Sequence, residues 1–122
     1  MRVLIADDSS IVRGRMATLL TDVKEVEIVG EAQDVPEAIE SVTRLKPDVV
    51  ILDMQMPGGS GIDVLKKIRE DNRSAIVMMF TNSPYSQHRQ RCMDLGADYF
   101  FDKSTEVEKL LTALEQWVAD PI

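Results

Sequence analysis

Apolar runs that contain no polar residue constrain the fold of this chain more than any other feature of its sequence. Such runs occur at Val3–Ile5, Val49–Leu52 and Ile76–Phe80. A short run without alternation of polar and apolar residues is typical of a strand buried on both faces of a parallel sheet. With two further runs, the sequence predicts strands at Val3–Ala6, Val26–Glu31, Val49–Leu52, Ala75–Phe80 and Tyr99–Phe101.

The segments between these runs show the spacing of amphipathic helices, with apolar residues three or four positions apart. The apolar stripes are Ile11, Val12, Met16, Leu19, Leu20 and Val23; Val35, Ala38, Ile39, Val42 and Leu45; Ile62, Leu65 and Ile68; and Val107, Leu110, Leu111, Leu114, Trp117 and Val118. Ser9 or Ser10, Asp34 and Ser104 are suited to begin helices, and Gly96 is suited to end one. Because strand and helix alternate five times, the sequence predicts an α/β fold, with a doubly wound, five-stranded parallel sheet and five helices.

Charge and cysteine content exclude several classes of protein. The 122 residues carry 14 Lys and Arg against 21 Asp and Glu, a net charge of −7, which argues against direct binding of this domain to nucleic acid or to anionic lipid. The single cysteine excludes an intrachain disulfide and a cysteine-rich zinc site. No run approaches the ~18 apolar residues of a membrane span, and the N-terminal residues lack the pattern of a signal peptide. We therefore expect a cytoplasmic protein without membrane contact.

Reactive side chains follow four of the five predicted strands. Asp7 and Asp8 follow the first strand, Asp53 the third, Thr81 the fourth and Lys103 the fifth. In a parallel sheet these strand ends lie at one edge, where ligands bind at the switch in strand order. Crowded carboxylates raise one another's pKa unless a cation lies among them, and Mg²⁺ prefers such oxygen ligands. Each aspartate alone is as consistent with a helix cap as with a site, but the set predicts a binding site at this edge.

At these positions the chain resembles the receiver domain of two-component response regulators, which has the chemotaxis-regulator-like fold. The residues that carry the resemblance are Asp7-Asp8, Asp53 within the stretch Pro47–Pro57, Ser60-Gly61, Thr81 and Lys103. It extends from Arg2 to the region of Ala119, and Val29–Ala32 is similar to the second strand of regulators that often carry a DNA-binding output domain. The resemblance implies a flavodoxin-like (βα)5 receiver fold, with residues 1–122 forming one receiver domain.

The resemblance also implies a phosphoryl acceptor and a metal site. Asp53 would accept a phosphoryl group from a sensor histidine kinase, a phosphotransfer protein or a small donor such as acetyl phosphate. Asp8, Asp53 and the backbone carbonyl of Gln55 would hold Mg²⁺, or Mn²⁺ in its place, and Asp7 would act through a metal-bound water. The domain would catalyse its own phosphorylation and autodephosphorylation without being a conventional enzyme.

Family members respond to phosphorylation through two switch residues, which correspond to Thr81 and Phe100. Thr81 and Lys103 would bind phosphoryl oxygens, and Phe100 would rotate inward as Thr81 moves. The change would reach an output partner through the surface formed by the fourth helix, the fifth strand and the fifth helix. The sequence departs from the family pattern at Ser104, where many members have proline, at Asn82, which is larger than usual, and at Phe100, which lacks a tyrosine hydroxyl.

Other functions are compatible with parts of the pattern. A haloacid-dehalogenase-like phosphatase also forms an aspartyl phosphate, but it needs a second aspartate at position 55, which is Gln55. A flavodoxin-like redox protein would bind a flavin phosphate after the first strand, where Asp7 and Asp8 would repel it. A pseudo-receiver, which acts as an interaction module without phosphorylation, is disfavoured because the acceptor-site groups are all present. A DNA-binding regulator would need an output domain as well.

Overall fold

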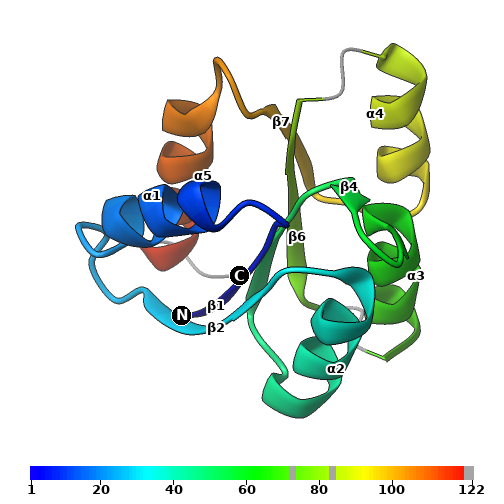
Figure 1. The fold of residues 1–122 in the computed structure, drawn as a ribbon. Coiled ribbons are helices and arrows are strands. Elements are labelled where there is room, and N and C mark those ends of the chain that lie inside the picture. The colour runs from blue at the N-terminus through cyan, green and yellow to red at the C-terminus, as the bar shows by residue number, and fades with distance from the viewer. Residues whose placement is uncertain (72–73, 83–84, 120–122) are drawn as a thin grey trace.

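Five parallel strands form the central sheet, in the order β2-β1-β3-β6-β7. The computed structural model describes residues 1–71, 74–82 and 85–119 (Figure 1). The strands are β1 (Arg2–Ala6), β2 (Glu27–Ala32), β3 (Val49–Leu52), β6 (Ile76–Thr81) and β7 (Tyr99–Asp102). The strand order changes direction between β1 and β3, so this position is the topological switch point at which α/β proteins bind ligands.

Helices cover both faces of the sheet, as the sequence predicted (Figure 1). The helices α1 (Ser10–Leu20) and α5 (Val107–Ala119) pack on one face. The helices α2 (Val35–Leu45), α3 (Gly61–Asp71) and α4 (Ser86–Asp94) pack on the other. The fold is therefore the doubly wound, flavodoxin-like α/β fold, with five helices among the residues that the structure describes. No helix in the described ranges is long and apolar enough to span a lipid bilayer.

Two apolar clusters, one on each face of the sheet, explain why polar and apolar residues do not alternate along the strands. Leu4 and Val50 pack with α2, α3 and α4 in one apolar cluster. Val3 and Ile51, their neighbours in sequence, pack with α1 and α5 in the other. Successive residues of a strand point to opposite faces of the sheet, so every position in these strands must be apolar when both faces are covered.

Local signals at the helix ends are mostly confirmed. The Ser9 hydroxyl accepts a hydrogen bond from Val12 N at 3.2 Å and caps α1. The Asp34 carboxylate caps α2 in the same way. Gly96, with a φ of +104°, follows the end of α4, in the left-handed region that favours glycine after a helix.

The prediction that the apolar stripe of α1 packs into the core was only partly correct. Met16 and Leu20 are buried, but 68% of Ile11 and 38% of Leu19 are exposed. α1 ends at Leu20, and Val23 is buried in the turn that follows. The outer side of α1 therefore carries apolar residues that do not contribute to the core, which sequence spacing alone does not distinguish.

Several predicted boundaries were wrong: β1 begins one residue earlier, at Arg2, β6 is shifted by one residue to Ile76–Thr81, and β7 extends to Asp102. At the start of α5 and in the second strand, the reason is that side chains form a turn or join the sheet. α5 begins at Val107 and not at Ser104, since Ser104 N and Oγ both donate to Asp102 Oδ1, at 2.8 and 2.6 Å. These bonds hold residues 102–105 in a turn. The second strand begins and ends one residue later than predicted, because Ala32 pairs with Ala6 of β1 and is fully buried.

A small hairpin that the sequence analysis missed follows β3. Its strands are β4 (Gln55–Met56) and β5 (Gly59–Ser60), which pair antiparallel. The turn between them uses Pro57 and Gly58, and Gly58 has a φ of +87°, which glycine adopts without strain. The hairpin forms one side of the loop that follows Asp53.

Candidate functional site

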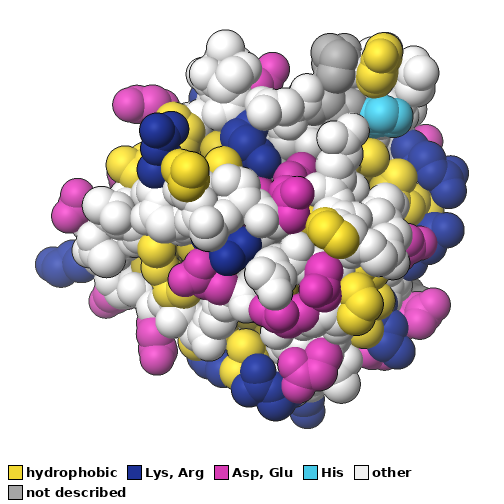
Figure 2. Space-filling view, in the orientation of Figure 1, with side chains coloured by type: hydrophobic (Ala, Val, Ile, Leu, Met, Phe, Trp, Pro, Cys, Tyr) yellow, Lys and Arg dark blue, Asp and Glu magenta, His cyan; other side chains and the backbone are white. Residues whose placement is uncertain are grey.

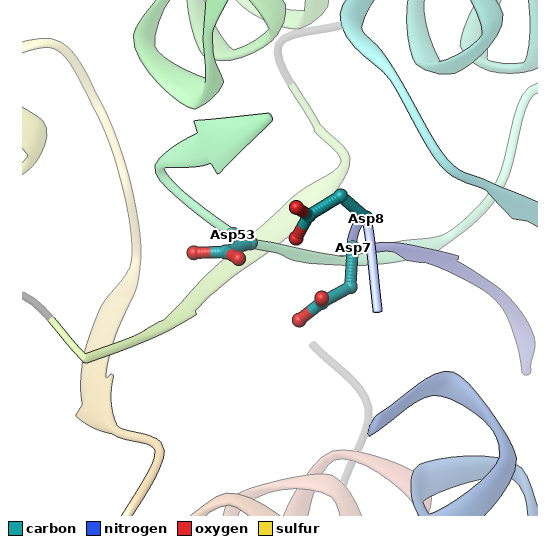
Figure 3. Close-up of side chains that lie close together, drawn as sticks. All are labelled: Asp7, Asp8 and Asp53. Carbon is teal, nitrogen blue, oxygen red and sulfur yellow. The ribbon is translucent and has the colours of Figure 1, made fainter. Parts of the chain in front are cut away.

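Three carboxylates meet where β1 and β3 end (Figure 3). Asp7 and Asp8 follow β1, and Asp53 follows β3, the strand beside it. One oxygen of each carboxylate lies within 4.8 Å of the others. Asp7 and Asp53 are buried, whereas Asp8 is exposed. Figure 2, in the orientation of Figure 1, shows acidic side chains near the middle of the molecular surface, in the region between α1 and β4.

A lysine connects two of these acids. Lys103 follows β7, and its Nζ donates to Asp7 Oδ2 at 2.6 Å and to Asp53 Oδ2 at 3.1 Å. Burial alone would lower the pKa of Lys103, but the hydrogen bonds and charges of Asp7 and Asp53 outweigh it, and the pKa lies above its ordinary value. Lys103 therefore stays protonated at neutral pH. A cation that the protein itself supplies thus relieves part of the repulsion among the acids.

The charge that remains fits a divalent cation. Three carboxylates against one ammonium group leave two negative charges in the cluster. Within the described part of the chain, Asp8 has neither a hydrogen-bond nor an ion-pair partner. Asp8 is thus unpaired in this part of the chain, and Asp53 shares the Lys103 ammonium group with Asp7. Their carboxylates therefore provide hard oxygen donors of the kind that Mg²⁺ binds. The residues present therefore fit a magnesium ion.

Backbone contacts hold the Asp53 loop tightly. Asp53 N donates to Ala6 O at 2.9 Å, and Gly61 N donates to Met54 O at 2.7 Å. A Cβ at position 61 would collide with the Asp53 carbonyl oxygen, so only glycine permits this close approach. Gln55 N also donates to Asp53 Oδ1 at 3.3 Å. The loop therefore presents the Asp53 carboxylate in a defined orientation.

An open hollow lies between Asp8 and the hairpin. Its volume is about 370 Å³, and Asp8 and Gln55 line it together with Pro57, Gly59 and Ser60. The hollow gives a small molecule access to the exposed side of the carboxylate cluster. Met54 and Met56 also line the hollow, which is large enough for a phosphate-sized group.

The other predicted site residues lie at different distances from the cluster. Thr81, the last residue of β6, is buried, and its carbonyl accepts a hydrogen bond from Lys103 N at 2.9 Å. Asn82 is exposed, and residues 83–84 fall outside the described ranges. Phe100 is buried in the core cluster that also contains Met54 and Cys92. Phe100 therefore lies inward, within the core.

Sequence reasoning missed Arg13 and Glu31. Arg13 Nη1 donates to the Asp7 carbonyl oxygen at 2.6 Å, and Arg13 Nε donates to Glu31 Oε1 at 3.1 Å. A basic residue one turn into a helix that follows two aspartates is the only signal in the sequence. Helical spacing cannot show that this side chain turns back toward the loop.

Comparison with known proteins identifies the family. A sequence model of the response regulator receiver domain matches residues 3–115. The chain belongs to this family. The nitrate/nitrite response regulator NarL of Escherichia coli K12 is 33% identical over 117 residues, which cover 96% of this chain and 54% of NarL. The chain therefore spans about half the length of the curated relatives it matches first.

Solved structures of receiver domains have the same fold. A LuxR-family response regulator from Aurantimonas is 30% identical, with a TM-score of 0.88, over 97% of this chain and 84% of that one. The isolated receiver domain of RcsB from Salmonella enterica serovar Typhimurium, in the presence of the phosphomimetic BeF3⁻, is 30% identical, with a TM-score of 0.85. That match covers 95% of this chain and 88% of the RcsB chain. The receiver fold inferred from the sequence is thus confirmed.

Proposed function

We propose that residues 1–122 form one receiver domain that acts as a phosphorylation-activated switch, with Asp53 as the phosphoryl acceptor. The observation that carries the proposal is the ammonium group of Lys103, which contacts the carboxylates of both Asp7 and Asp53. Phosphoryl transfer depends on positioning and on positive charge near the transferred oxygens. Lys103 supplies a fixed point charge beside Asp53, and the hollow beside Asp8 offers access to a donor.

The transfer step forms one bond and breaks another. A carboxylate oxygen of Asp53 attacks the phosphorus of the donor, and the bond from phosphorus to the donor's leaving nitrogen or oxygen breaks. An acyl phosphate results on Asp53, and the donor's electron pair leaves with the kinase histidine or, for acetyl phosphate, with acetate. Lys103 and Thr81 would hold the phosphoryl oxygens.

The metal would be held by Asp8, Asp53 and the carbonyl of Gln55, with Asp7 acting through water. Support comes from the unpaired Asp8 carboxylate and from the excess negative charge of the cluster. Mg²⁺, or Mn²⁺ in its place, would offset charge on the nucleophile and on the incoming phosphoryl group. Gln55 follows Asp53 by two residues, and its N–H already bonds the Asp53 carboxylate, which keeps the Gln55 peptide close to the cluster.

The signal would leave through Thr81 and Phe100 to the surface formed by α4, β7 and α5. Thr81 ends the strand beside β7, and Phe100 lies on β7. Phe100 is buried, and a phenyl ring has no hydroxyl to desolvate in that position. We therefore infer that the inward state is populated before phosphorylation. The partners would be a sensor histidine kinase or phosphotransfer protein upstream and an output protein or domain downstream, in the cytoplasm.

Intact-mass measurement tests the acceptor. Incubation with acetyl phosphate and Mg²⁺ should add one phosphoryl group to the wild type and to Asp22→Asn, an exposed control on the turn after α1. Asp53→Asn should gain none. A phosphoryl group that persists in Asp53→Asn would move the acceptor elsewhere, and no labelling of the wild type would favour the pseudo-receiver.

Chemical shifts test the switch. Addition of beryllofluoride and Mg²⁺ should move amide signals across residues 85–103 in the wild type and to a smaller extent in Thr81→Ala. Asp53→Asn is the control, since beryllofluoride then has no carboxylate to bind. Shifts confined to the acceptor loops would exclude this route.

A further inference from the structure

Arg13 makes two contacts that link three segments at the carboxyl end of the sheet. Its Nη1 donates to the carbonyl oxygen of Asp7 in the loop after β1, and its Nε donates to the carboxylate of Glu31 in β2. Only 14% of the Arg13 side chain is exposed. The 2.6 Å bond to the Asp7 carbonyl is a charge-assisted bond, of the stronger class in proteins.

The carbonyl that Arg13 holds belongs to the peptide unit between Asp7 and Asp8. A peptide unit is planar, so a fixed carbonyl also fixes the directions in which the chain leaves toward the two side chains. The other side of Asp7 is held as well, because Asp7 N donates to Ala32 O at 2.9 Å. The Asp8 side chain has no partner of its own in the described ranges, so its direction depends on this peptide unit and on the next one, in which Ser9 N donates to Asp7 Oδ1 at 2.9 Å.

A second ion pair in the chain shows what Arg13 does beyond pairing with a glutamate. Arg44 Nε bonds Glu40 Oε1 at 2.8 Å on α2, with 61% and 58% of the two side chains exposed. The atoms that pair are the same as in Arg13 and Glu31, but the Arg44 pair is solvated and contributes little. Arg13 differs because its guanidinium also binds a main-chain oxygen next to the acidic cluster.

We propose that Arg13, held in place by Glu31, is a positioning residue for the metal site, and that it acts by orienting the peptide unit between Asp7 and Asp8. The inference rests on the proposed function, since it assigns these acids to a cation. For the affinity of the site for a cation when Arg13 is replaced, this proposal predicts a change opposite in sign to that expected from the charge alone. Removal of a positive charge beside an acidic cluster should strengthen cation binding, whereas loss of a positioning contact should weaken it.

Calorimetric titration of the metal-free full chain with Mg²⁺ distinguishes the two signs. We expect Arg13→Gln to bind Mg²⁺ about tenfold more weakly than the wild type, within the range measured for contacts that support metal ligands. Glu31→Gln should lose less, because Arg13 keeps its bond to the Asp7 carbonyl. Arg44→Gln, with the same change of charge on α2, should bind like the wild type. Affinity that is unchanged or stronger in Arg13→Gln would overturn the proposal.

Arg13→Lys separates the carbonyl contact from the pair with Glu31. An ammonium group can still donate to the Asp7 carbonyl, so this variant should recover most of the Mg²⁺ affinity lost in Arg13→Gln. If Arg13→Lys binds as weakly as Arg13→Gln, the carbonyl contact is not the cause and the proposal fails. Urea unfolding of each variant shows whether the loss of affinity exceeds any loss of stability.

A metal-free measurement keeps this inference separate from the proposed function. The backbone amide signal of Asp8 should shift in Arg13→Gln, shift back toward the wild-type position in Arg13→Lys, and stay in place in Arg44→Gln. If the wild type binds no Mg²⁺, the proposed metal site fails, while the shifted Asp8 signal still supports the orienting role. An Asp8 signal that does not move in Arg13→Gln overturns the orienting role whether or not Mg²⁺ binds.

Discussion

The helices α3 and α4 lie on the same face of the sheet (Figure 1) but are held very differently. The buried residues of α3 are Gly61, Val64, Leu65 and Ile68. Its first turn is capped reciprocally, since Ser60 Oγ accepts from Ile62 N and Ser60 N donates to Asp63 Oδ2. By contrast, Cys92 is the one buried residue of α4, and Tyr85, the residue at its N-cap, makes no side-chain cap hydrogen bond within the described ranges. One helix is anchored by apolar burial, and the other rests on a few specific contacts.

The contacts that do hold α4 lead to the residues around the site. Cys92 Sγ lies 3.7 Å from the sulfur of Met54, which follows Asp53. Arg89 lies 5.7 Å from the Phe100 ring centroid and donates to the Phe100 carbonyl at 3.1 Å. Meanwhile α3 carries Gly61, which closes the Asp53 loop. The anchored helix α3 therefore holds the site in shape, while the lightly held helix α4 is suited to move when the site changes.

Truncation of a buried side chain in each helix gives the largest expected effect. Leu65→Ala in α3 should lower the free energy of unfolding by about 3 kcal/mol, because a fully buried leucine leaves a cavity. Cys92→Ala in α4 should lower it by only about 1 kcal/mol. Urea unfolding followed by circular dichroism measures both. Equal losses in the two variants would contradict the difference in anchoring.

In the wild-type protein, α4 should also open locally more often than α3. Amides of α4 should exchange with solvent about tenfold faster than those of α3, since a helix with one buried side chain opens at a lower free energy. Native-state hydrogen exchange by NMR measures the two sets in one sample. If α4 is protected as strongly as α3, the switch must use another element.

Alkaline pH should weaken α4 through its only cysteine. Burial raises the pKa of the Cys92 thiol above its ordinary value of 9.0. The folded state thus keeps a proton that the unfolded chain releases, so the contribution of Cys92 is complete below this value and is lost as the pH rises through the folded pKa. The stability difference between wild type and Cys92→Ala should stay constant near neutral pH and shrink from about pH 8 to pH 10. A constant difference over that range would refute this sign.

Loss of the Arg89 contacts should give the smallest effect. Arg89→Gln removes both the ring contact and the bond to the Phe100 carbonyl, which together are worth about 0.5–1 kcal/mol. The rate at which a thiol reagent modifies Cys92 should rise about threefold, since labelling requires α4 to open. Arg15→Gln, which removes an exposed arginine of α1, is the control and should label like the wild type. If Cys92 is modified at the same rate in Arg89→Gln as in the wild type, Arg89 does not hold α4.

Most of the fold and most of the site were predictable because their signals are local and repeated. Buried parallel strands are apolar at every position, so β1, β3 and β6 stand out in the sequence. The reactive residues each follow a strand, and parallel strand ends share an edge, so the meeting of Asp7, Asp8, Asp53 and Lys103 could be expected. The roles of these residues as acceptor, metal ligands and phosphate ligands remain predictions that the experiments above address.

Some features depend on contacts between segments far apart in the chain, and they could be seen only in the folded molecule. The layered α/β fold could be predicted from the sequence, because the pattern of buried residues repeats along each strand and helix. The sequence by itself did not determine that Arg13 turns back to the Asp7 carbonyl, that Lys103 bridges two acids, or that Ile11 stays exposed. Each of these depends on the direction of one side chain in space, which packing against other segments selects from several rotamers of similar energy.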